Sequence, residues 1–143
     1  MILKLKLPDR SGKIADCVLG FDTIAEYDRG RDDTQYMGAI VGRHAGRISH
    51  SKFTLDGVTH KLEPNERTHQ LHGGDCNWHR RNYASKTIKN GVEFRHTSED
   101  GDGNYPGKVH VMIRYTLKNG TLATRFEAKL DKKETKSTPI SIA

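Results

Sequence analysis

Three two-residue turn signals divide most of the chain into paired segments of alternating polarity. Asp56-Gly57, Asn90-Gly91 and Asn119-Gly120 each separate two segments in which apolar and polar residues alternate. Asx-Gly pairs favour the positive φ angles of the tight turns that join adjacent antiparallel strands. The sequence therefore predicts three β-hairpins. Their strands are expected at 51–55 and 58–62, 83–89 and 92–97, and 109–117 and 122–130.

The chain before these hairpins carries weaker strand signals. Residues 1–7 alternate leucine with lysine and predict a half-buried strand, which a turn at 8–12 links to a second strand at 14–19. The polar stretch 20–36 is expected to be loop, with room for one helical turn at 23–27. Since no segment has an apolar stripe three helical turns long, we predict an all-β, antiparallel fold in one domain, 1–143.

Composition limits the classes of partner. The formal charge of +6 and pI near 9.4 raise the question of nucleic acid. The basic residues are scattered, however, and the densest clusters, at 79–81 and 129–136, are short. No RNA-stacking motif or zinc-finger spacing accompanies them, so we predict a solvated basic surface and no nucleic-acid partner.

The expected compartment is the cytoplasm. Two cysteines, Cys17 and Cys76, cannot form a disulfide framework. The opening stretch MILKLKLP is too short to be the apolar region of a signal peptide. No apolar run approaches the roughly 18 residues of a membrane span, so no membrane partner is expected. No cofactor is expected either.

Two groups of candidate metal ligands are weak. The spacing H-x2-H-x3-C-x2-H over His69, His72, Cys76 and His79 matches no familiar zinc pattern, and we expect His69 and His79 to be exposed loop histidines. The acidic loop 99–107 lacks the EF-hand spacing and its closing glutamate, which favours a turn over a calcium site. We therefore predict no metal site.

Gly46, Arg47 and His72 are the candidate binding residues. Glycines permit tight turns, while an arginine fork and an imidazole held beside such turns recognise the hydroxyls of a polyol or the oxygens of an anion. Without further context, an arginine in the position of Arg47 is more often a surface or structural ion-pair residue, and a histidine in the position of His72 is usually an ordinary loop residue. Asn65, after Pro64, is most simply a turn residue.

Five segments in order give the chain a family resemblance. They are GFDTIAEY, GAIVGRHAGRISHSKFTLDG, LEPNERTHQLHGG, SEDGDGNYPGKVHVMIRYTL and STPISIA. Together they resemble the aldose 1-epimerases, or galactose mutarotases. The resemblance implies a large antiparallel β-sandwich, the galactose mutarotase-like supersandwich, of which this chain is expected to be a truncated part.

The resemblance also implies a substrate and a pocket. It implies action at the anomeric centre of aldohexoses such as galactose and glucose, whose α and β anomers the family interconverts. By this resemblance Arg47 and His72 line the sugar pocket. Gly46 stands where an asparagine commonly contacts the sugar, and it supplies backbone but no side-chain amide.

The family's catalytic histidine and glutamate would lie beyond Ala143, so no catalytic residue is expected within the chain. The alternatives are a non-catalytic sugar-binding remnant and an incomplete gene product without activity of its own. An incomplete sandwich is expected to self-associate through unpaired strand edges, which we place at 108–117 and 121–130.

Overall fold

The computed structural model describes residues 1–27 and 36–131. The charged run at 28–33 and the STPISIA motif lie outside these residues. The chain divides into two compact units, residues 1–40 and 41–143, which are described separately. Within the described ranges the one α-helix has four residues, and no helix is long and apolar enough to cross a membrane.

The described residues of the first unit form one short hairpin and one helical turn. Strand β1 (Lys6–Pro8) pairs antiparallel with β2 (Ile14–Asp16), and α1 covers Ile24–Tyr27. The predicted helical turn is confirmed. The Thr23 backbone N–H and hydroxyl both donate to the Glu26 carboxylate at 2.9 Å, which closes the start of α1 as in a capping box.

The strands of this hairpin are shorter than predicted. The leucines of the first segment are more buried than its lysines, as the alternation requires. The ladder ends early because the Asp16 carboxylate accepts the backbone N–H groups of Leu5 and Val18, at 3.0 and 3.1 Å. Side-chain acceptance of backbone donors competes with strand pairing.

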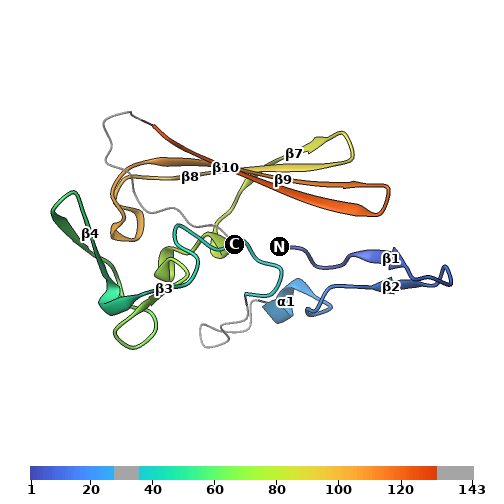
Figure 1. Cartoon of the computed structure of the whole chain (residues 1–143), viewed down its shortest axis with the longest axis horizontal. Helices are drawn as coiled ribbons and strands as arrows, with labels where there is room; N and C mark the ends of the chain where they lie inside the picture. Colours follow the sequence, from blue (N-terminus) through green and yellow to red (C-terminus); the bar gives the residue numbers. More distant parts are fainter. Residues whose placement is uncertain (28–35, 132–143) are drawn as a thin grey trace. The chain divides into compact units, whose positions relative to one another are not determined.

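The second unit contains a four-stranded antiparallel sheet in the order β10-β9-β8-β7 (Figure 1). Its strands are β7 (Ala84–Ile88), β8 (Gly91–Ser98), β9 (Val109–Lys118) and β10 (Thr121–Leu130). The turns Asn90-Gly91 and Asn119-Gly120 join β7 to β8 and β9 to β10, with φ of 59° at Asn90 and 49° at Asn119. Two predicted hairpins are thereby confirmed.

The two faces of this sheet differ in burial. On β9, Val109, Val111 and Ile113 are at most 2% exposed. Trp78 and Tyr105, which precede and follow β8, are equally buried and complete the core. The intervening β9 residues face the opposite side, so the predicted alternation of apolar and polar positions is confirmed.

Of the two segments predicted as sheet edges, 108–117 and 121–130, only the second is an outer strand in the described part of the sheet. Strand β9 lies between β8 and β10, because its register with β8 runs from Gly91–Thr116 to Ser98–Val109. In the described part of the sheet the outer strands are β7 and β10. Phe126 on β10 remains 39% exposed, as expected for a strand with a neighbour on one side.

The remaining strands of this unit form two small antiparallel pairs. Strand β3 (Arg47–Ile48) pairs with β6 (Gln70–Leu71), and β4 (Lys52–Leu55) pairs with β5 (Val58–Lys61). The β4–β5 pair is the third predicted hairpin, and its Asp56-Gly57 turn has positive φ at both residues. Between residues 41 and 131 this unit also contains four 3-10 turns: η1 (Ser49–Ser51), η2 (Gly74–Cys76), η3 (Trp78–Arg80) and η4 (Asp102–Asn104).

Candidate functional site

The pairing of β3 with β6 brings the three candidate binding residues together. Arg47 lies opposite Leu71 in this ladder, so Gly46 before β3 meets His72 after β6. The Gly46 N–H donates to His72 Nδ1 at 3.0 Å, and the His72 N–H donates to the Gly46 carbonyl at 3.0 Å. These two reciprocal hydrogen bonds fix both the backbone and the imidazole of His72.

The hydrogen bond at Nδ1 defines the state of the His72 ring. A nitrogen that accepts an amide hydrogen carries no proton, so the neutral imidazole has its proton on Nε2. Partial burial, and then the neighbouring Arg47 charge, lower the pKa of His72. At neutral pH the residue is therefore an uncharged N–H donor at Nε2.

Backbone conformation explains the glycines around this pair. Gly73 has φ of 88°, and a Cβ built on it would lie 2.0 Å from the Gly42 carbonyl oxygen, so a side chain there would displace the backbone. Gly46 has φ of 102°, but a Cβ on it would meet no atom within 4 Å. At Gly46 glycine is favoured by conformation and not by lack of space.

Asn65 holds the end of β6 and is more than the turn residue expected. Its Nδ2 donates to the Leu71 carbonyl at 3.0 Å, and its Oδ1 accepts the Leu71 N–H at 2.7 Å. The side chain thus satisfies both backbone groups of the residue that precedes His72. A ladder of two residues does not by itself fix the position of β6. The two hydrogen bonds of Asn65, which we call the Asn65 clasp, supply the missing restraint.

Glu66 fixes the direction of Arg47. The guanidinium donates from Nε to Oε2 at 2.5 Å and from Nη2 to Oε1 at 2.8 Å. This bidentate pair holds the pKa of the Glu66 carboxyl below its usual range and raises the pKa of Arg47. Arg47 therefore forms the ion pair left open by the sequence and also lies beside His72, with its Nη1 outside the pair.

A buried arginine anchors the acidic loop near these residues. Arg43, 2% exposed, donates from Nε to the Ser98 hydroxyl at 3.0 Å and from Nη2 to the Glu99 carbonyl at 2.6 Å. Its Nη1 donates to the Pro106 carbonyl at 3.0 Å, so one side chain ties together both ends of the loop. Nothing in the local sequence distinguished Arg43 from a surface arginine.

The anchored loop supports β6 through Tyr105. The Tyr105 hydroxyl donates to Gln70 Oε1, and Gln70 Nε2 donates to the Glu63 carbonyl at 3.1 Å. Gln70 and Tyr105 are both at most 1% exposed. Strand β6, which positions His72, is therefore held by Tyr105 through Gln70 as well as by Asn65 through Leu71.

The acidic side chains of this loop bind protein groups. Asp102 accepts from the Ser98 hydroxyl at 2.8 Å and from Arg81 Nη2 at 2.7 Å. Over residues 1–27 and 36–131, no group of three or more His, Cys, Asp or Glu side chains is arranged to hold a metal ion.

The two histidines expected to be exposed are half-buried. His69 Nδ1 accepts the His50 N–H at 3.0 Å, and His79 lies in η3 directly after the fully buried Trp78. Burial lowers the pKa of His79 to about 4. The expectation of solvated loop histidines is wrong because His79 lies within the 3-10 turn η3 and His69 forms a bridge with Glu66 directly before β6.

Sequence comparison links the whole chain to known enzymes. The family model described as Aldose 1-epimerase matches residues 1–143. The galactose mutarotase of Bos taurus is 38% identical over 141 residues, which are 99% of this chain and 39% of that protein. The aldose 1-epimerase of Escherichia coli (strain K12) is 30% identical, with 92% of this chain and 38% of that protein aligned. The chain thus spans about two fifths of the length of these relatives.

Solved structures agree with the sequence comparison. A crystal structure of an aldose epimerase homologue from C. elegans superposes with a TM-score of 0.81 at 33% identity, covering 91% of this chain and 40% of that one. The galactose 1-epimerase of Lactobacillus acidophilus NCFM gives a TM-score of 0.69 at 25% identity, covering 82% and 36%. The predicted all-β fold is confirmed.

Proposed function

The chain belongs to the aldose 1-epimerase family, and on that premise we propose that it forms the sugar-positioning part of such an enzyme. The proposed substrate is an aldohexose such as galactose or glucose. The observation that carries this proposal is the reciprocal pair of hydrogen bonds between Gly46 and His72, with Arg47 beside them. We also propose a cytoplasmic location, in keeping with the two free cysteines, Cys17 and Cys76.

The proposed contacts use groups whose directions are already fixed. His72 donates from Nε2 to an oxygen of the sugar, and Arg47 donates from Nη1, which lies outside its pair with Glu66. Donors that are held before the ligand arrives lose little freedom on binding, and they restrict the orientation of the ring. Gly46 leaves room for a hydroxyl beside His72.

The proposed role is positioning and not proton transfer. Interconversion of anomers requires a base for the anomeric hydroxyl and an acid for the ring oxygen, with pKa values near the working pH. Glu66 is the carboxylate beside Arg47, but both its oxygens accept from that guanidinium and its pKa is lowered. The pKa of His72 is lowered as well. This carboxylate and imidazole are therefore poorly suited as a catalytic pair.

Titration of the ¹⁵N-labelled chain with galactose and with glucose tests the proposal. We expect NMR shifts at Gly46 and His72 that are lost in Arg47→Gln but retained in Arg125→Gln. Arg125 is a matched control because it forms an exposed ion pair with Glu127, as Arg47 does with Glu66. Absence of shifts at both residues with either sugar would rule out sugar binding here.

Polarimetry of α-galactose separates positioning from catalysis. We expect the purified chain to leave the rate of mutarotation at the value for buffer. An acceleration that disappears in His72→Ala would show that the chain transfers protons after all, and the positioning role would then be incomplete.

One observation favours a second candidate, an incomplete product that associates through strand edges. Strand β10 runs from Thr121 to Leu130 and pairs on one side with β9. Its exposed Phe126 would be covered by a further strand. A concentration-dependent molecular mass that Phe126→Lys returns to the monomer value would favour this candidate.

A further inference from the structure

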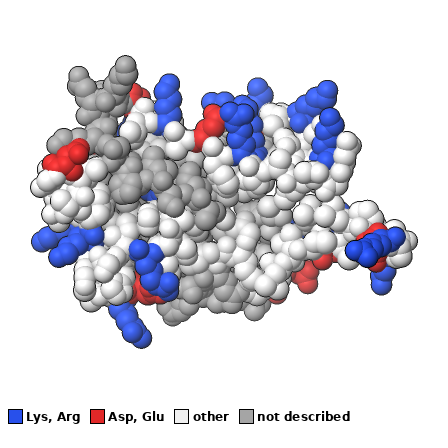
Figure 2. Space-filling model, in the orientation of Figure 1, with Lys and Arg blue, Asp and Glu red and all other residues white. Residues whose placement is uncertain are grey.

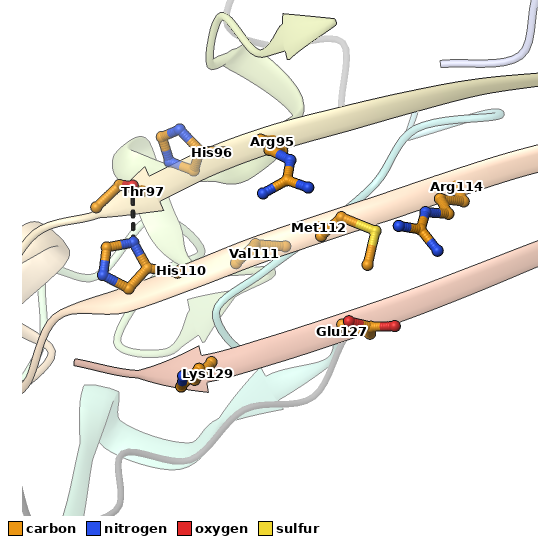
Figure 3. A pocket seen from close by; sticks show the side chains of 9 residues that line it. All are labelled: Arg95, His96, Thr97, His110, Val111, Met112, Arg114, Glu127 and Lys129. Carbon is orange, nitrogen blue, oxygen red and sulfur yellow. Dashed lines mark hydrogen bonds between the residues drawn. The ribbon is translucent and has the colours of Figure 1, made fainter. Parts of the chain in front are cut away.

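A groove of about 360 Å³ lies on the polar face of the four-stranded sheet, on β8, β9 and β10. Lysine and arginine side chains gather over the part of the molecule that this sheet occupies (Figure 2). Figure 3 shows the groove from close by, with Arg95 on β8, Met112 and Arg114 on β9 and Glu127 and Lys129 on β10. It is built by other strands than those that carry Gly46, Arg47 and His72.

A buried carboxylate organises the two arginines of the groove. Glu93 is 4% exposed and lies opposite Arg114 in the register of β8 with β9. Arg95 Nε donates to its Oε1 and Arg114 Nε donates to its Oε2, each at 2.6 Å. Arg114, and then Arg95, keep the pKa of Glu93 below its usual range. The carboxylate therefore stays charged and fixes both guanidinium groups.

Only one edge of each guanidinium is used by this contact. Both arginines reach Glu93 through Nε, and the residues that the structure describes offer their Nη groups no further hydrogen bond. Because the two Nε atoms bond to one carboxylate, the two forks are held a few ångström apart. Two positive charges meet one negative charge, so the pair of forks retains a net positive charge.

The other charges of the groove do not cancel this excess. Glu127 is already paired with Arg125 at 2.7 Å, and His110 Nε2 lies 3.3 Å from Asp131. Lys129 has no ion pair among residues 1–27 and 36–131. The groove therefore presents a lysine and two oriented guanidinium groups to an incoming ligand, with Met112 among its lining residues.

We propose that this groove binds the phosphate group of a small phosphate ester. Guanidinium forks match the tetrahedral oxygens of a phosphate through paired N–H donors, and the charge of the groove is complementary to the anion. A site of this kind goes beyond the proposed sugar contacts, and neither depends on the other. The sugar site and the phosphate site then lie on different strands of the same unit.

Titrations with inorganic phosphate and with glycerol phosphate at constant ionic strength test this site. We expect the side-chain Nε–Hε signals of Arg95 and Arg114 to shift with both probes. Tighter binding of glycerol phosphate would favour the ester, and equal binding would favour the free anion as the natural source. Arginine signals that do not move with either probe would overturn the proposal.

Two lysine variants separate a site from general attraction between charges. Lys129→Gln and Lys118→Gln each remove one exposed charge from the polar face of the sheet, but only Lys129 lines the groove. Neither touches Glu93, so both should fold. We expect Lys129→Gln to weaken phosphate binding about five- to tenfold and Lys118→Gln less than about twofold. Equal losses in the two variants would contradict a defined site.

Discussion

Two arginine–glutamate clusters in the second unit are built in opposite ways. Arg47 and Glu66 pair near the surface, on and beside strands of two residues, and their geometry depends on side chains such as Asn65. Glu93 lies buried between Arg95 and Arg114, on strands of eight and ten residues; alternation along β8 sets its contact with Arg95, and the β8–β9 register sets its contact with Arg114. The comparison shows that a long ladder positions charged groups by itself, whereas a short one needs additional hydrogen bonds.

Truncation of the sheet core should produce the largest effect. Ile113 is 1% exposed at the centre of β9, so Ile113→Ala should lower the free energy of unfolding by about 2–5 kcal/mol. Chemical denaturation followed by fluorescence of Trp78 measures this. A loss no larger than that caused by Asn65→Ala would contradict the view that the ladder carries most of the stability.

Acid should weaken the 3-10 turn that contains His79 and the Glu93 cluster at different pH values. The pKa of His79 is about 4 in the folded chain and 6.5 in the unfolded chain, so the unfolded state binds more protons between these values. The contribution of neutral His79 to the free energy of unfolding is therefore fully present above pH 6.5 and is lost as the pH falls towards 4. After allowance for partial exposure, this loss is on the order of 2 kcal/mol. The Glu93 contribution has the same sign, but it is lost only below the usual glutamate pKa of 4.5.

Unfolding midpoints measured from pH 7.5 to 4 test this dependence. The slope between pH 6.5 and 4 should flatten in His79→Gln, because that variant has no imidazole to protonate on unfolding. An unchanged slope in His79→Gln would assign the acid sensitivity to other groups.

Loss of the Asn65 clasp should disturb the short strands alone. Asn65→Ala removes both hydrogen bonds to Leu71 and should cost about 1–2 kcal/mol. Amide hydrogen exchange should accelerate at Leu71 and His72 and stay unchanged across β8 and β9. Uniform acceleration over the whole unit would show that the two regions are not independent.

Removal of the Glu66 charge should have the smallest effect on stability. The Arg47–Glu66 pair is exposed, so Glu66→Gln should leave the melting temperature nearly unchanged. Galactose affinity should nevertheless change by about two- to fivefold, because Arg47 loses its fixed direction. A clear fall in melting temperature without a change in affinity would make Glu66 a purely structural residue.

The sequence predicted the long hairpins better than the binding site, for a physical reason. Strands of eight to ten residues show period-two alternation, and the Asx-Gly turns at Asn90 and Asn119 fix their pairing. Strands β3 and β6 have two residues each, which is too short for a period. Their pairing, and with it the contact between Gly46 and His72, was not predicted; the family resemblance only assigned Gly46, Arg47 and His72 to one sugar pocket.

Buried polar residues escaped prediction altogether. Arg43 and Gln70 are at most 2% exposed, yet nothing in their local sequence indicated this burial. Their burial depends on contacts with Ser98 and Tyr105, which lie 55 and 35 residues away in the sequence. Hydrogen bonds to partners so far away in the sequence leave no recognisable pattern in a short stretch of residues.

The most direct test of the sugar-positioning role is the imidazole ¹⁵N spectrum of His72 during a galactose titration at pH 7.5. We predict a neutral ring protonated at Nε2, whose Nε2 signal moves on addition of the sugar while Nδ1 remains bonded to the Gly46 amide. A His72 spectrum that galactose leaves unchanged, while residues elsewhere respond, would contradict the account.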